Sequence, residues 1–488
     1  MSNDAPAMTA PIGEVPSPTR PIAIDIAAAV LLLAGALAVR TVSLGADPPL
    51  WLSWSAGIFT DEAMYAADAR SVALFGHWAP GDFHGAIISP LLYALQLGAF
   101  RLFGPTIEAA RMISVVMGLA TVAFLWIAMD RSVGRRAAWI AATLLAFCPQ
   151  FVFYNRLALM ETPVACCLTA SFACLATVWT GTDKRRNWLI AGGVCFAFAV
   201  AFKALAWLAL PGFLIAARRG GKRDVGVFAG AVLAAYGLFW ITAILPYAGT
   251  VARMNAYYLQ HQYLPHSAMG LWHNVKRALL TGTEDGLLKS LWEGQGLVSY
   301  FALIGLVSSK FKKFHARYLI LGWTLVPAVA FMVMSYTPSR YYVIIWPALI
   351  CLIAFGCCQL APKYAIACAT FLVLGELFFL SIALPERGSQ TAPTAASVTR
   401  NLDGVVVAGQ FAPRLVFGTR AVSVYVQPGL ANDNRPVERH GVTAIAVTRS
   451  KYWETWWKDR YPAIIRPDHI LGTLRIGDKY DVDIYRVQ

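Results

Sequence analysis

Charged residues are scarce in this sequence: Asp, Glu, Lys and Arg make up 14% of 488 residues, whereas hydrophobic residues make up 58%. A soluble protein of this length needs far more charge to cover its surface. Apolar runs of about 16–22 residues recur along the chain, close to the ~20 residues that a helix needs to cross a bilayer core. The scarcity of charge therefore excludes a soluble protein and predicts a polytopic membrane protein.

Acidic residues are few even relative to basic ones, with 27 Asp and Glu against 41 Lys and Arg and a formal net charge of +14. Such an excess can indicate nucleic-acid binding. Here, however, the basic residues cluster in short loops between apolar runs, which is the positive-inside pattern of membrane proteins. The charge distribution therefore favours membrane insertion over nucleic-acid binding.

Several common motifs are missing. The sequence contains no internal repeat and no glycine-rich nucleotide-binding motif, and its nine cysteines lie in or beside apolar runs without the spacing of metal ligands. We expect the cysteines to be small buried hydrophobes and neither disulfide partners nor zinc ligands. No small-residue cleavage pattern follows residues 22–39, so the sequence predicts an uncleaved first span and not a signal peptide.

Basic loops set the predicted topology. Residues 88–103 are ambiguous, because this short run carries Gln96 and Arg101 and suits either a span or an interfacial helix. With a cytoplasmic N-terminus, the Lys and Arg clusters face the cytoplasm only if 88–103 does not cross. We therefore predict about eleven spans and an outer C-terminus. The clusters are at 131–136, 184–186, 218–223 and 310–317. The predicted spans are 22–42, 108–130, 136–154, 161–180, 187–202, 203–217, 225–246, 293–308, 318–335, 341–359 and 363–384.

The predicted fold is an α-helical polytopic membrane protein with interfacial helices and a small extracytoplasmic α/β domain. Residues 1–21, rich in Pro, Ala and Ser, are expected to form a flexible cytoplasmic tail. The transmembrane domain covers 22–384 and carries outer loops at 43–107 and 247–292. From 385 the composition changes, and short β-branched runs in 385–488 predict strands. These strands are expected at 404–408, 422–426, 443–447 and 478–487.

Two adjacent carboxylates, Asp61 and Glu62, follow the first apolar run. The stretch from Asp61 to Phe75 favours a short helix, which Gly76 ends. A span followed directly by an acidic pair places charge at a membrane surface. There a carboxylate is hydrated but still close to lipid-linked substrates, and it can act as a general base. The pair is therefore the first candidate for a functional site.

Further charged residues fall at the outer ends of predicted spans: Glu161, Lys203 and Arg340. Charged groups near membrane segments are costly and are functional candidates. Lys and Arg suit a phosphate group, and neither Lys203 nor Arg340 has an acidic neighbour in the sequence. We therefore expect both cations to lack a partner until an anionic lipid phosphate meets them.

Each of these residues also has a purely structural explanation. Asp61 and Glu62 could cap the helix that follows them, and Glu161 could cap its own helix. Lys203 could extend towards the lipid headgroups, and Arg340 could anchor the chain at the interface. Their shared position on one side of the membrane is what favours a common function.

Short motifs follow one another in a fixed order from the acidic pair onward. They are Thr60 to Ala66, Gly76-His77-Trp78-Ala79-Pro80, Ser89 to Tyr93, Phe103-Gly104 with Arg111, Arg156 to Glu161, Lys203, and Arg340-Tyr341 with Pro347. With these motifs in this order, residues 20–360 resemble the GT-C superfamily of membrane glycosyltransferases. The resemblance is to the branch of protein O-mannosyltransferases and lipid A aminoarabinose transferases.

The resemblance implies a GT-C fold and a sugar donor linked to a polyprenyl phosphate. Asp61 would act as the general base on an acceptor hydroxyl or help to position it, with Glu62 and Glu161 as further catalytic residues. Attack at the anomeric carbon would expel the lipid phosphate and invert the configuration. The family often has Asp where this chain has Glu161, and this difference leaves the donor and the acceptor open.

By the same resemblance, Lys203, Arg340 and Tyr341 would bind the donor phosphate. Arg111 and His84 would contact substrate. The family often has Lys-Pro-Pro-Leu where this chain has Ser-Pro-Leu from residue 89, so a basic contact is missing there, and His84 is the candidate to replace it.

The implied protein is a glycosyltransferase of the bacterial inner membrane that acts on the extracytoplasmic side. It transfers a hexosyl or pentosyl group to lipid A, a glycan or a protein. The sequence requires no cofactor, although a divalent cation at Asp61 and Glu161 stays open; His261, His266 and His273 in the 247–292 loop fit no ligand spacing. One alternative is a lipid or solute transporter, which usually shows internal repeats. Another is a GT-C scaffold that binds polyprenyl lipid without transferring sugar.

Overall fold

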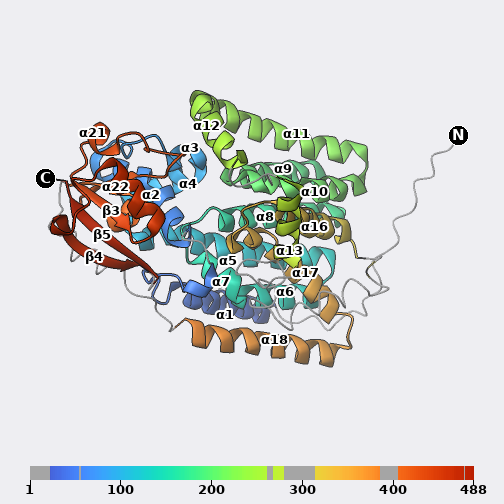
Figure 1. Ribbon diagram of the computed structural model, residues 1–488. Coiled ribbons are helices and arrows are strands. Elements are labelled where there is room, and N and C mark those ends of the chain that lie inside the picture. The colour runs from blue at the N-terminus through green and yellow to red at the C-terminus, as the bar shows by residue number, and fades with distance from the viewer. Residues whose placement is uncertain are drawn as a thin grey trace.

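The computed structural model describes residues 22–53, 57–260, 267–279, 311, 314–384, 405–476 and 479–487. Most of this chain forms helices that run side by side, and a small sheet near the C-terminus lies at one end of the helix bundle (Figure 1). A helical membrane protein with a small C-terminal α/β domain is the predicted fold class, and at this level the prediction is confirmed.

Long apolar helices dominate the bundle. Among the described residues, five helices are long and apolar enough to cross a membrane, or six if the bent pair α6–α7 crosses as one. The pair meets at 59°, because Pro149 lacks the N–H that would continue α6. The count of eleven stays a prediction, and its span at 293–308 lies outside the described residues. The bounds are α1 Ile22–Thr41, α5 Ile107–Ser132, α6 Arg135–Phe147, α7 Pro149–Asn155, α8 Glu161–Trp179 and α18 Pro362–Ala383.

Two predicted spans begin with a 3₁₀ turn instead of an α-helix. The turn η2 (Ala204–Ala209) precedes α10 (Leu210–Ala217), and η8 (Ser339–Ile344) precedes α17 (Trp346–Cys357). These turns follow α9 (Arg185–Phe202) and α16 (Arg317–Val333) respectively. Lys203 and Arg340 therefore both lie where an irregular stretch of backbone begins, and such stretches in membrane proteins occur where the chain is buried in protein or lines a cavity.

The helix that starts at Lys222 does not end at residue 246, where the predicted span ended. After α11 (Lys222–Phe239) it passes through a π-helical segment, η4 (Trp240–Ile244), and a 3₁₀ turn, η5 (Leu245–Tyr247), into α12 (Ala248–Tyr258). π-Helical turns are rare in proteins, and those that occur are often found at functional sites. The predicted outer loop at 247–292 thus contains α12 and also α13 (Ala268–Leu279).

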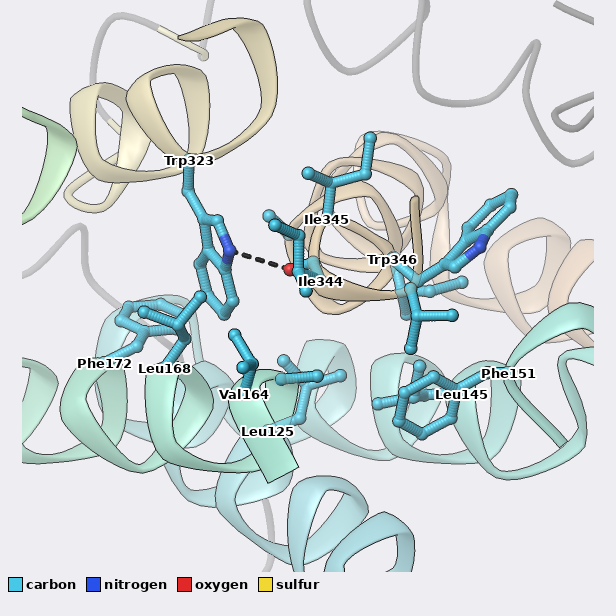
Figure 2. Packing of buried hydrophobic residues seen from close by; sticks show 14 of the residues in the cluster. Leu125, Leu145, Phe151, Val164, Leu168, Phe172, Trp323, Ile344, Ile345 and Trp346 are labelled. Carbon is cyan, nitrogen blue, oxygen red and sulfur yellow. Dashed lines mark hydrogen bonds between the residues drawn. The ribbon is translucent and has the colours of Figure 1, made fainter. Parts of the chain in front are cut away.

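The centre of the bundle is packed by large side chains (Figure 2). The fully buried indole of Trp323 in α16 donates a hydrogen bond to the carbonyl oxygen of Ile344 in η8, 2.8 Å away. Figure 2 shows this pair resting on Leu125 of α5 and on Val164 and Phe172 of α8. The bond satisfies a carbonyl that the 3₁₀ turn leaves free, and it fixes η8, the segment that carries Arg340, against the core.

The segment after α1 folds at the end of the bundle that meets the sheet (Figure 1). Helix α2 (Gly57–Phe75) starts four residues before the predicted Asp61 and ends at Phe75 as predicted, with Gly76 at φ 81°. Helices α3 (Gly85–Ile88) and α4 (Pro90–Phe103) follow. With 14 residues, α4 is shorter than the ~20 residues that a membrane span requires, which supports its predicted interfacial position.

The C-terminal domain contains a five-stranded sheet in the order β2-β1-β3-β5-β4. Strands β1 to β3 are parallel, and β5 pairs antiparallel with both β3 and β4. The sequence predicted four of these strands and missed β4, whose ladder is interrupted by a register shift between Ile470 and Gly472. The bounds are β1 Val406–Gly409, β2 Val422–Tyr425, β3 Ala444–Thr448, β4 Ile470–Ile476 and β5 Tyr480–Arg486, with helices α20 Ala412–Leu415, α21 Pro436–His440 and α22 Lys451–Arg460.

Candidate active site

A cavity of about 600 Å³ lies where the helix bundle meets the C-terminal domain. Helix α2, the turns η2 and η8 and the continuous run from α11 to α12 contribute to its walls. The C-terminal domain adds Gln410, which follows β1, and residues of β2 and the loop after it. Among the described residues that line it, the charged side chains are Asp61, Lys203 and Arg340. Together with Tyr341, which also lines the cavity, four of the predicted site residues therefore meet there.

The charged side chains form a connected network. Arg340 Nη2 lies 2.6 Å from Asp61 Oδ2, and Arg340 Nε lies 3.5 Å from Glu161 Oε1. The same Glu161 oxygen accepts a hydrogen bond of 2.6 Å from Lys203 Nζ. Two acids and two cations thus alternate in one network, of which Asp61, Arg340 and Lys203 line the cavity and Glu161 lies behind them. The sequence placed all four at outer ends of predicted spans, and the structure brings them into direct contact.

Tyr341 and the two cations form the next part of the site. Lys203 Nζ lies 4.3 Å from the centroid of the Tyr341 ring, and the Arg340 guanidinium lies 5.7 Å from the same centroid. A ring between two cations stabilises both through its electron-rich face. Tyr341 lines the cavity and is buried, so the structure places it beside the cations with which it was predicted to act.

The expectation that Lys203 and Arg340 lack partners was wrong. Each is paired with a carboxylate, and their side chains are 11% and 5% exposed. Sequence distance misled the prediction, because Glu161 lies 42 residues from Lys203 and still reaches it across two adjacent helices. Some hydrogen-bonding capacity is left over: Arg340 Nη1 and Glu161 Oε2 are buried without a hydrogen-bond partner among the described residues.

Glu62 does not line the cavity. Its Oε1 and Oε2 accept hydrogen bonds of 2.6 and 2.7 Å from the Arg111 guanidinium, and Oε1 also accepts one of 2.9 Å from the backbone N–H of Ala158. Both side chains are 1% exposed. A carboxylate held in this way is a fixed charge, so Glu62 and Arg111 hold α2 in position. A catalytic role for Glu62 and a substrate contact for Arg111 stay predictions.

His84 also lies away from the cavity lining. Its Nδ1 is 3.1 Å from Asp68 Oδ1, and the second oxygen of Asp68 accepts a hydrogen bond from the backbone N–H of Ala86. The His84 ring packs against Trp78, with ring centroids 4.9 Å apart. Asp68 belongs to α2, so His84 connects the following loop to the helix that carries Asp61. Its contact with substrate stays a prediction.

Several lining residues were missed by sequence reasoning. Gln410, Tyr425 and Gln427 of the C-terminal domain line the cavity together with Tyr257 of α12. Tyr425 is enclosed deeply enough that burial, with the nearby charge of Asp61, raises the pKa of its hydroxyl well above the ordinary value. A residue in a short predicted strand carries no signal of this kind in the sequence. The C-terminal domain therefore closes one side of the candidate site.

A large part of the cavity lining is aliphatic or aromatic. These side chains come from the end of α9 with η2 and from the end of α11 with η4. The residues are Phe202, Leu205, Trp207, Leu208, Tyr236, Phe239, Trp240 and Ile244. The cavity therefore combines three charged side chains with an extensive apolar lining, and it is amphipathic.

The residues at this site fit a metal ion poorly. The described part of the chain contains no group of three or more His, Cys, Asp or Glu side chains that could hold one. Asp61 and Glu161 both contact the Arg340 guanidinium, and a divalent cation between them would be repelled by that charge. No chemical step is therefore assigned to a metal.

The comparisons with known proteins agree with this geometry. A family model described as dolichyl-phosphate-mannose-protein mannosyltransferase matches residues 88–245. The fold resembles ArnT from Cupriavidus metallidurans in the apo state, with a TM-score of 0.69, 15% identity, and coverage of 94% of this chain and 98% of that chain. The same protein bound to undecaprenyl phosphate gives a TM-score of 0.65, 14% identity and the same coverage.

A more distant likeness is to the archaeal oligosaccharyltransferase AglB from Archaeoglobus fulgidus in complex with an inhibitory peptide and a dolichol-phosphate. It has a TM-score of 0.58 and 12% identity, and the match covers 86% of this chain and 69% of that one. No curated protein matches the chain by sequence. The fold, the mannosyltransferase family match and the ordered motifs agree, and the chain resembles the GT-C membrane glycosyltransferases of the ArnT and protein O-mannosyltransferase branch.

Proposed function

We propose that this chain is a membrane glycosyltransferase that moves a sugar from a polyprenyl phosphate to an acceptor hydroxyl at the outer face of the membrane. The observation that carries the proposal is the amphipathic cavity, whose lining combines Asp61, Lys203 and Arg340 with many apolar side chains. A lipid with a phosphate head and a hydrocarbon tail matches both kinds of lining. Structures of similar fold hold undecaprenyl phosphate or dolichol-phosphate.

The donor phosphate would bind at Arg340 and Lys203. Arg340 presents a planar fork and has an Nη1 group without a hydrogen-bond partner among the described residues, whereas Lys203 supplies a point charge. The prenyl chain would lie against the apolar lining that includes Trp207 and Trp240, where it removes apolar surface from water. This arrangement leaves the sugar beside Asp61.

Donor binding would also change the ion pairs of the site. A phosphate competes for the same N–H groups that now contact Asp61 and Glu161, since charge-assisted hydrogen bonds to phosphate and to carboxylate are of similar strength. Asp61 is then released from Arg340 to face an acceptor. In this mechanism donor binding frees Asp61 to act as the base, so the acceptor is activated only when a donor is present.

The chemical step is a displacement at the anomeric carbon. Asp61 accepts the proton of the acceptor hydroxyl, the hydroxyl oxygen forms the new glycosidic bond, and the bond between the anomeric carbon and the phosphate oxygen breaks. The phosphate leaves with the electron pair, and Arg340 and Lys203 stabilise its charge. Attack opposite the leaving group inverts the configuration, for either a hexosyl or a pentosyl donor.

The acceptor would approach beside the C-terminal domain, where Gln410, Tyr425 and Gln427 line the cavity. Lipid A, another cell-surface glycan and a protein all supply a hydroxyl group. We place the protein in the bacterial inner membrane, with the C-terminal domain outside and the basic loops inside, because the Lys and Arg clusters follow the positive-inside rule.

This orientation predicts the behaviour of inserted reporters. A reporter active only outside the cytoplasm should be active when fused after the C-terminal residue of the full chain. It should be silent when inserted at Gly220, within a cluster of basic residues. Enzymatic reporter activity in intact cells is the measurement, with immunoblots to show equal expression. The reverse pattern would place Asp61 in the cytoplasm and would contradict outer-face transfer.

The function itself is tested in two steps. First, the masses of lipid A, surface glycans and envelope proteins are compared between deletion and wild-type cells, and one class should lose a single sugar on deletion. Second, purified protein in nanodiscs should release free polyprenyl phosphate from a polyprenyl-phosphate-linked hexose or pentose when that acceptor is added. A transporter would move the lipid without cleaving it, and a binding scaffold would hold the donor without release.

A further inference from the structure

We infer that Arg414, in the C-terminal domain, is a positioning residue for Asp61. The inference rests on the proposed transferase function and adds to it a role for the C-terminal domain in holding the catalytic helix. Arg414 belongs to the four-residue helix α20, and its side chain is 2% exposed. A guanidinium buried so deeply, at the contact between two domains, needs partners of opposite charge.

The partners of Arg414 come from the membrane domain. Its Nη2 donates a hydrogen bond of 2.6 Å to Asp47 Oδ1, and its Nη1 lies 3.7 Å from Glu62 Oε2. Glu62 is the chain neighbour of Asp61 and is held on its other side by Arg111. Two acids and two arginines from four separate segments thus form a charge-balanced cluster directly behind the catalytic residue.

Apolar packing holds the same segment on α2. Phe411 and Leu415 share a buried cluster with Phe59 of α2, and Phe417 packs with Ala63 and other buried residues of that helix. One short stretch of the C-terminal domain thus packs against α2 both before and after Asp61. Packing of this kind fixes rotation of α2 about its axis, which sets the direction of the Asp61 side chain.

A second arginine, Arg70, belongs to α2 and contacts the C-terminal domain. Arg70 of α2 donates hydrogen bonds of 2.7 and 2.6 Å to the carbonyl oxygens of Val416 and Thr419. Its guanidinium also lies 5.8 Å from the centroid of the Phe417 ring. Arg414 reaches from the C-terminal domain to α2, and Arg70 reaches from α2 to the C-terminal domain. These contacts, one from each side, hold α2 rigidly against the C-terminal domain.

Glu62 also connects this cluster to the segment that carries Glu161. Its Oε1 accepts a hydrogen bond from the backbone N–H of Ala158, three residues before Glu161. The cluster therefore joins the segment that ends in Glu161 to the helix that carries Asp61. Loss of the Arg414 charge would remove the cation that bonds Asp47 and faces Glu62 from the C-terminal domain. The position of α2 would then shift relative to Glu161.

The test compares Arg414→Met with a matched control, Arg439→Met. Arg439 also connects the C-terminal domain to the membrane domain, through Asp82 at 3.1 Å, but this pair is exposed and does not contact α2. Each variant is purified in nanodiscs. Release of polyprenyl phosphate is measured with a polyprenyl-phosphate-linked sugar and the acceptor that the wild type uses.

We expect Arg414→Met to lower kcat by ~10- to 100-fold, because a misplacement of about 1 Å in a catalytic group can reduce the rate by ~10²-fold. The KM for the donor should change by less than about threefold, since Lys203 and Arg340 are untouched, and effects on kcat alone report interactions made in the transition state. Arg414→Lys keeps the charge and should recover most of the loss. Arg439→Met should match the wild type.

A double variant separates positioning from general destabilisation. If Arg414 acts through Glu62, Arg414→Met combined with Glu62→Gln should be no slower than the slower single variant, because effects along one chain of contacts are not additive. Wild-type kcat in Arg414→Met, or additive losses in the double variant, would overturn the inference. If Arg414→Met does not fold, Asp47→Asn takes its place, because it removes the charged partner of Arg414. It should also lower kcat, and wild-type kcat in this variant would overturn the inference.

The outcome for the wild type keeps this inference separate from the function on which it rests. Wild-type protein that releases no polyprenyl phosphate from any tested donor contradicts the proposed transferase activity. Wild-type protein that is active, while the Arg414 variants behave like the Arg439 control, contradicts only the positioning role. The same preparations therefore decide both questions.

Discussion

Asp61→Asn is expected to abolish sugar transfer while the protein remains folded. The substitution keeps the size of the side chain and removes its ability to accept a proton. Loss of a positioned general base typically lowers a rate by ~10²–10⁴-fold. The measurement is release of polyprenyl phosphate by purified protein, with thermal unfolding in the same nanodiscs as the test of folding. Asp82→Asn is the control, because Asp82 pairs with Arg439 at an exposed position.

The same variant tests whether donor and Asp61 compete for one cation. Arg340 Nη2 lies 2.6 Å from Asp61 Oδ2, so a donor phosphate has to displace this carboxylate. A neutral Asn is a weaker competitor, and Asp61→Asn should bind polyprenyl phosphate at least as tightly as the wild type. Full transfer activity in the variant would exclude Asp61 as the base. Weaker lipid binding would exclude the exchange of ion pairs.

The membership of the charged network was predictable to a large extent. Asp61, Glu161, Lys203 and Arg340 were grouped because the positive-inside rule places all four on one side. A topology argument of this kind gives the side of the membrane and not the distance between groups. It therefore could not show that the acids and the cations pair with each other, which the structure shows at 2.6 Å for two of these pairs.

The sequence could not predict that Asp61 faces the cavity while the adjacent Glu62 faces the protein interior. Neighbouring residues on a helix point about 100° apart, so one of an acidic pair can face a cavity while the other faces the protein interior. Which one does so depends on the position of Arg111, 49 residues further along, and on Arg414 in another domain. The contribution of Tyr425 to the cavity depends in the same way on how the sheet docks, which no local pattern records.

Backbone irregularities were the other source of error. The continuation of α11 through the π-helical segment at Trp240 was missed, because the apolar pattern ends near residue 246 while helical hydrogen bonding continues to Tyr258. Bends were missed where proline opens a new helix, as at Pro149. Apolar length predicts that a segment is buried in the membrane, and the positions of helix ends depend on local hydrogen bonding that hydropathy does not measure.

Alanine at Arg340 or Lys203 is expected to weaken binding of polyprenyl phosphate. Loss of one hydrogen bond to a charged group typically reduces binding by ~1.5–3 kcal/mol. Binding of undecaprenyl phosphate to purified variants in nanodiscs is the measurement. Lys363→Ala is the control, because this exposed lysine at the start of α18 does not line the cavity.

The two cations should differ in which substitutions they tolerate. Arg340 contacts Asp61 through Nη2 and Glu161 through Nε, and a lysine has no planar fork with which to reproduce both contacts and still hold a phosphate. Lys203 makes one hydrogen bond to Glu161 and lies over the ring of Tyr341, which a guanidinium can also do. Arg340→Lys should therefore be harmful, and Lys203→Arg should be partly tolerated. If both alanine variants bind the lipid as tightly as the wild type, the cations serve only to neutralise Asp61 and Glu161, and the donor phosphate binds elsewhere.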